Sequence, residues 1–131
     1  MARAAHWYNL AAENGMPEAQ YRLGMLTENG PGTPRNEVEA AKWYGLAAEQ
    51  GYAQAQVRLG SCYATGKGVP QDNYKAYCWL TLATKRSLRD AERQRIRLAP
   101  KLSAEDVTKA EQSAMAWKPK HGSVDKSAGP R

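Results

Sequence analysis

The sequence repeats itself with a period of 36 residues. Trp7, Trp43 and Trp79 stand 36 positions apart, and residues 4–39 aligned on 40–75 without a gap share 17 identical positions. Two unrelated segments of this length, with average amino-acid composition, would share about two or three identical positions by chance. A period of this length is typical of solenoids, in which each unit buries its apolar face against the next unit.

Each unit has the pattern of two helices. In residues 40–50 the apolar residues recur at helical spacing, and Gly51 follows at the place where a left-handed residue ends a helix. A second helix is expected over residues 53–65, with Gly60 in its middle, as Gly24 is in the first copy. Glycine there lowers helix propensity by about 1 kcal/mol, so we expect the neighbouring helix to approach closely.

The repeat predicts an all-α protein, an α/α solenoid of 36-residue helix–turn–helix units with a C-terminal helical cap and about six helices. Residues 1–39 are expected to form the first repeat, with a truncated start as one alternative, and residues 40–75 the second. Residues 76–117 are expected to hold a half repeat and capping helices, with Ser103 as the N-cap of the last. Residues 118–131, rich in Lys, Gly, Ser and Pro, are expected to be a disordered basic tail.

These units resemble the Sel1-like repeat family. The matching motifs are AAKWY at 40–44, AAEQG at 47–51, LGSCY at 59–63 and GKGVPQD at 66–72. The resemblance covers residues 4–83 and implies an α-solenoid similar to tetratricopeptide repeats. It also implies a non-enzymatic adaptor or scaffold whose first helices line a concave surface that holds a protein or peptide partner.

The resemblance also suggests which residues face such a partner. They are the positions of each first helix that lie outside the apolar stripe, and a segment lying along the wall would meet them in turn. These positions are His6, Asn9, Glu13, Glu39, Lys42, Gly45, Glu49, Lys75, Cys78 and Thr81.

No residue pattern indicates a catalytic, cofactor or metal site. Glu13 and Glu49 are explained as repeat equivalents rather than as a carboxylate pair, and no Cys/His spacing fits zinc. Some cysteine-rich relatives have been associated with β-lactamase activity, but Cys62 and Cys78 do not repeat, so we rank this activity third. We favour a buried Cys62 and a surface thiol at Cys78, with a disulfide between them as the alternative.

The chain's excess of positive charge lies C-terminal to the repeats. Residues 1–84 hold seven basic and seven acidic residues, whereas 85–131 hold twelve basic and six acidic residues, which accounts for the whole net charge of +6. Within the expected cap helix 85–97, one face carries Arg86, Arg89, Arg93 and Arg97. In the alternative function, this stripe binds an anion, a nucleic acid or a membrane surface. We favour a solvated outer face, because Asp90 and Glu92 offset the charge and no aromatic residues are interleaved.

The N-terminal end of the repeat array lacks the polar cap that solenoids need. Trp7 and Leu10 are therefore candidates for exposure, and we expect self-association through this edge. Two units and a half are few for a solenoid, so we expect the chain to be the C-terminal part of a longer array. Neither a signal peptide nor a membrane segment is recognisable, which suggests a cytoplasmic protein, or a periplasmic one if the parent is exported.

Overall fold

The computed structural model describes residues 2–29, 36–85 and 89–119, and in the first helix it describes side chains from Tyr8 onward. Within these ranges the chain forms seven α-helices, one more than expected, and no strand. The helices are α1 (Ala2–Glu13), α2 (Pro17–Asn29), α3 (Glu37–Glu49), α4 (Ala53–Thr65), α5 (Asn73–Thr84), α6 (Arg89–Leu98) and α7 (Ala104–Ala116). A short 3₁₀ turn, Ala99–Lys101, precedes α7. The predicted all-α solenoid is confirmed.

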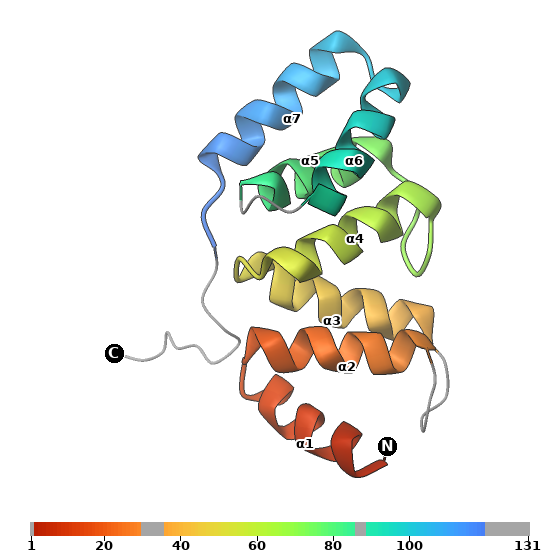
Figure 1. Ribbon diagram of the computed structural model, residues 1–131, viewed down its shortest axis with the longest axis vertical. Coiled ribbons are helices and arrows are strands. Elements are labelled where there is room, and N and C mark those ends of the chain that lie inside the picture. The colour runs from red at the N-terminus through yellow and green to blue at the C-terminus, as the bar shows by residue number, and fades with distance from the viewer. Residues whose placement is uncertain (1, 30–35, 86–88, 120–131) are drawn as a thin grey trace.

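The helices stack in chain order from α1 to α6, each on the one before it (Figure 1). We refer to α1 and α2 as unit one, α3 and α4 as unit two, and α5 and α6 as unit three. The tail predicted at 118–131 lies almost wholly outside the described residues. No described helix is long and apolar enough to cross a lipid bilayer.

Mid-helix glycines allow the units to pack closely, as the sequence predicted. A Cβ atom on Gly24 would stand 2.7 Å from the ring of Tyr44, and one on Gly60 would stand 2.8 Å from Leu80. Tyr44 and Leu80 occupy equivalent positions 36 residues apart, and both are fully buried. Each glycine therefore admits a fully buried core side chain of the following unit into the seam between units.

The turn inside each of the first two units is built with the same hydrogen bonds. The side-chain amide of Gln20 donates to the carbonyl oxygen of Ala12, and that of Gln56 donates to Ala48, each at 3.1 Å. Gly51 takes a φ of 94° after α3, so the left-handed C-terminal residue predicted there is confirmed. Because these buried polar groups are satisfied in the same way twice, the two turns share one geometry.

The N-cap of α3 was missed from the sequence. The Asn36 side chain accepts a hydrogen bond from the backbone N–H of Glu39, so α3 begins at Glu37, earlier than residue 40. Asp72 caps α5 in the same way. Asn36 is the repeat equivalent of Asp72, and this correspondence is the signal that would have revealed it.

Candidate partner-binding face

The repeated tryptophans hold one unit against the next. Trp43 packs on the small core formed by Ala12, Ala19 and Leu23, whereas Trp79 packs on the core that contains Ala48, Ala55 and Leu59. These two sets are repeat equivalents, so Trp43 and Trp79 pack on matching cores. The side chain of Trp7 lies outside the described residues. Trp43 and Trp79 are half-buried, so each also forms part of the surface carried by α1, α3 and α5, which we call the first-helix face.

On unit two this face contains an open hollow of about 620 Å³. Its described lining comes from α3 and its cap: Asn36, Val38, Glu39, Lys42, Trp43 and Leu46. Val38 is 57% exposed and Leu46 is 42% exposed, so the hollow has an apolar floor open to solvent. Glu39 and Lys42 are exposed and place one charge of each sign on its rim.

On unit three the equivalent hollow is smaller, about 290 Å³, and it is partly covered by α7. Lys75, Cys78, Trp79 and Leu82 line it at the positions of Glu39, Lys42, Trp43 and Leu46. Ser113, Ala114 and Trp117 of α7 form the opposite wall. The indole ring of Trp117 meets that of Trp79 edge-on, with 6.1 Å between ring centroids and 76° between planes.

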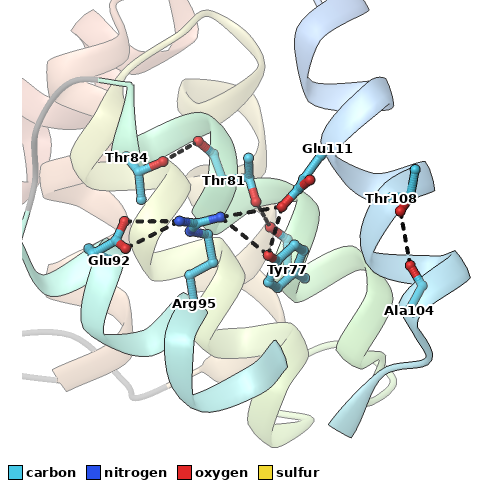
Figure 2. A network of polar contacts seen from close by, with 8 residues as sticks. All are labelled: Tyr77, Thr81, Thr84, Glu92, Arg95, Ala104, Thr108 and Glu111. Carbon is cyan, nitrogen blue, oxygen red and sulfur yellow. Dashed lines mark hydrogen bonds and ion pairs between the residues drawn. The ribbon is translucent and has the colours of Figure 1, made fainter. Parts of the chain in front are cut away.

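A polar network fixes α7 on α5 (Figure 2). The Tyr77 hydroxyl donates to the Glu111 carboxylate at 3.2 Å and accepts a hydrogen bond from the Arg95 guanidinium at 3.2 Å. Arg95 also pairs with Glu92, at 3.2 Å, and with Glu111, at 3.7 Å. Burial raises the pKa of Tyr77, so its hydroxyl keeps the proton that it donates. Arg95 therefore joins α6, α5 and α7.

The last turn of α7 is held by a lysine of α5's end. The Lys85 ammonium donates to the carbonyl oxygen of Ala114 at 2.9 Å. This carbonyl also accepts a long hydrogen bond of 3.4 Å from the backbone N–H of Trp117, and a cation is favourable at a helix C-terminus. The predicted N-cap at the other end is confirmed, because the Ser103 hydroxyl accepts from the backbone N–H of Asp106.

The structure divides the ten predicted partner-facing residues into groups. Glu39 and Lys42 line the hollow on unit two, and Lys75 and Cys78 line the hollow on unit three. Asn9 and Glu13 are exposed on α1, Glu49 is half-buried at the end of α3, and the side chain of His6 lies outside the described residues. A Cβ on Gly45 would meet no atom within 4 Å, so this position is open. Thr81 is half-buried, and its hydroxyl donates to the carbonyl oxygen of Tyr77 at 2.8 Å.

Sequence reasoning missed the apolar part of the hollow on unit two. Trp43 belongs to the repeated apolar stripe and was therefore assigned to the core, whereas Leu46 was placed neither on that stripe nor among the partner-facing positions. Val38 carried a usable signal, because it stands between Glu37 and Glu39 at the start of the helix. Nothing in the repeat separates the exposed Leu46 from its buried equivalent Leu82.

The basic stripe predicted on the cap helix is divided between two hollows. Arg89 and Arg93 line a hollow of about 630 Å³ between α4 and α6, which also contains Arg58. Arg97 instead lines a smaller one of about 210 Å³ with Lys101. Arg86 lies outside the described residues. Three of the four arginines are thus exposed on the far side of α6 from the network of Arg95.

Both cysteines are free thiols. Cys62 is buried in the core of unit two, and this burial raises its pKa to about 11. Cys78 is half-buried beside the α7 contact, and burial raises its pKa too. Among the described residues, no three His, Cys, Asp or Glu side chains gather as a metal-ligand set.

Stacked helix pairs with a 36-residue period define this protein as an α/α solenoid of the repeat class. The Sel1 repeat family model matches residues 1–16, 17–52 and 53–88, and the chain belongs to this family. The family model counts each unit from its second helix, with the same 36-residue period. A comparison with curated protein sequences finds no match.

Two solved structures share the architecture. One is a protective antigen of uropathogenic Escherichia coli with an SLR fold, with a TM-score of 0.83 and 34% identity over 88% of this chain. Another is a Sel1 repeat protein from Oxalobacter formigenes, with a TM-score of 0.73 and 42% identity over 74% of this chain. The chain spans about a quarter of the length of each, 25% and 28%. Proteins of this family commonly mediate protein–protein interaction, and the fold is typically non-catalytic.

Proposed function

We propose that this chain is a non-enzymatic adaptor or scaffold module that binds a protein partner through its first-helix face. The observation that carries the proposal is the open hollow of about 620 Å³ around Trp43. Its floor exposes Val38 and Leu46, two large apolar side chains that a solvated surface would not need. Contiguous exposed apolar surface with a polar rim is typical of sites for protein partners.

Unit one also exposes an apolar residue on its first helix. Leu10 is the repeat equivalent of Leu46 and is 44% exposed on α1. A partner segment lying across both units would meet these two leucines in turn, with Asn9, Glu39 and Lys42 beside them. The rim carries charges of both signs, so the partner is selected by shape and apolar contact more than by its net charge.

Site-specific photo-crosslinking tests the proposal. A photo-reactive amino acid replaces Lys42 in one variant and Arg93 in the other, since both residues are basic and exposed but lie on different faces. We expect position 42 to form a discrete adduct with a protein in cells of the source organism, and position 93 to form none. The adduct should disappear when Leu46→Glu is added and should persist when Ile96→Glu is added.

Ile96→Glu is the matched control because Ile96 is an exposed aliphatic residue on α6, 61% accessible. It introduces the same charge and removes a side chain of the same size, away from the hollow. Adducts that form at position 93 and never at position 42 would contradict the proposal. Adducts at position 42 that are insensitive to Leu46→Glu would contradict it as well.

The hollow between α4 and α6 supports a second candidate, binding of an anionic ligand. Arg58, Arg89 and Arg93 line it, with Asp90 as the acidic member of its lining. Arg58 was not foreseen, because it stands in the second repeat, outside the basic segment. Retention on heparin that falls steeply with salt and is lost in Arg58→Glu and Arg93→Glu would favour this candidate. Retention unchanged by both reversals would exclude it.

A further inference from the structure

The same site exists twice in this molecule, and in one copy its occupant is visible. Leu82 is 7% exposed beneath α7, whereas its repeat equivalent Leu46 is 42% exposed. Trp79 has the indole of Trp117 against its ring, whereas Trp43 borders the open hollow. Unit three therefore shows which kind of element this surface accepts.

The occupant of unit three is an amphipathic helix with a narrow contact face. Its inward residues are Ala110 and Ala114, with the half-buried Val107 one turn before them and the extended C-cap residue Trp117 directly after the helix. Ala110 and Ala114 are buried, and their small side chains let the two helix backbones approach closely. Trp117 supplies the one large side chain, at the end of the helix that lies over Trp79.

We propose that the hollow at Trp43 binds an amphipathic helix of a protein partner, with a contact face of small residues that ends in a tryptophan or another large aromatic residue. This inference rests on the proposed function and specifies its partner. Two residues that line the hollow beneath α7 on unit three, Trp79 and Leu82, have identical equivalents on unit two. These equivalents are Trp43 and Leu46. Edge-on pairing of aromatic rings would then place the partner's ring against Trp43.

The polar residues argue for a partner helix rather than for α7 of a second copy. Lys85 donates to the carbonyl of Ala114, in the last turn of α7, whereas the equivalent position on unit two is Glu49. An ionised carboxylate has no hydrogen to donate to a helix C-terminal carbonyl. A helix that continues beyond its aromatic residue satisfies those carbonyls internally and needs no such donor.

A designed peptide tests this directly on the full chain. The probe is a fluorescein-labelled, stapled helix with the sequence of residues 104–117, extended by one turn of alanines, because an unstapled helix of this length is marginal in water. Its control carries alanine at the position of Trp117. We expect saturable binding by fluorescence anisotropy, with the alanine control weaker by at least about tenfold, because a buried aromatic anchor dominates such contacts.

Protein variants locate the bound peptide. Leu46→Glu and Val38→Glu should each weaken binding by at least about tenfold, since both place a charge in the apolar floor. Ile96→Glu should leave binding unchanged, and circular dichroism should show the same helicity for all three variants. Raising the salt from low to physiological concentration should change the affinity less than about threefold, because the rim bears both signs of charge.

The inference is overturned if the alanine control binds as tightly as the probe, or if neither Leu46→Glu nor Val38→Glu affects binding. It is also overturned if sedimentation shows a dimer that Leu46→Glu dissociates, since the occupant is then a second copy. A non-helical segment cross-linked at position 42 overturns this inference and leaves the proposed function standing. If the photo-reactive residue at position 42 cross-links to no protein, that result contradicts the proposed function itself.

Discussion

Units two and three present nearly the same surface and differ in what lies on it. Unit two leaves Trp43 and Leu46 around an open hollow, whereas unit three has α7 packed over Trp79 and Leu82. The difference comes from outside the repeat, in residues 104–117, which pack on α5 instead of continuing the stack on α6. A repeat therefore sets the shape of its surface, and its neighbours decide whether that surface is free to bind.

The largest effect should come from replacing the same leucine in the two units. Leu82→Ala should lower the free energy of unfolding by about 2–4 kcal/mol, because it opens a cavity beneath α7. Leu46→Ala should lower it by about 1 kcal/mol or less, because its side chain is already in water. Urea unfolding of both variants measures the difference. Equal losses would show that α7 does not protect unit three.

The next effect concerns the glycines, at which the units should behave alike. Gly24→Ala and Gly60→Ala should each destabilise the fold by about 1–3 kcal/mol, because the new Cβ collides with Tyr44 or Leu80. Gly45→Ala should instead stabilise it by about 0.5–1 kcal/mol, since this helical position is open. Thermal unfolding compares the three. A neutral Gly60→Ala would mean that the seam between units two and three is loose.

The smallest effect should be on the reactivity of the two thiols. Cys62 reports on the core of unit two, and Cys78 reports on the packing of α7 over unit three. Cys78 should react with a disulfide reagent before the buried Cys62, and Trp117→Ala should speed the reaction of Cys78 alone. An unchanged rate at Cys78 would show that Trp117 does not shield this hollow.

The pH dependence of Cys62 has a definite sign. Burial raises its pKa from 9.0 to about 11, so the unfolded chain loses this proton at lower pH than the folded chain. Stability from this group is complete below pH 9 and is lost as the pH rises toward 11. Urea unfolding at pH 8 and pH 10.5 should show this loss in the natural chain and less of it in Cys62→Ala.

Much of the fold could be predicted because two phased copies constrain one another. Gly51, Asp72 and the mid-helix glycines have roles that depend on local geometry, and the local sequence shows them. The candidate site was only half predictable. Glu39 and Lys42 were named as partner-facing positions, whereas Val38 and Leu46 beside them in the hollow were not.

The position of α7 could not be predicted, because the helix is not a copy of anything in the repeat. The spacing of Val107, Ala110, Ala114 and Trp117 in the sequence gives one apolar face without indicating which helix would bury it. The inward orientation of the Arg95 side chain could not be predicted, for the same reason. Its partner Glu111 lies on α7, and only the packing of α7 on α5 brings the two together.

The short connection before α7 makes the two hollows unequal in a further way. Only the turn Ala99–Lys101 and two more residues separate α6 from α7, so α7 is a tethered ligand of its own chain. A short tether holds its ligand at an effective concentration of about millimolar. A free helix competing for unit three must overcome that local concentration before it contacts Trp79. The same helix arriving at unit two meets no described segment that it must displace, so we expect a partner helix to occupy the hollow at Trp43 at concentrations far too low to dislodge α7.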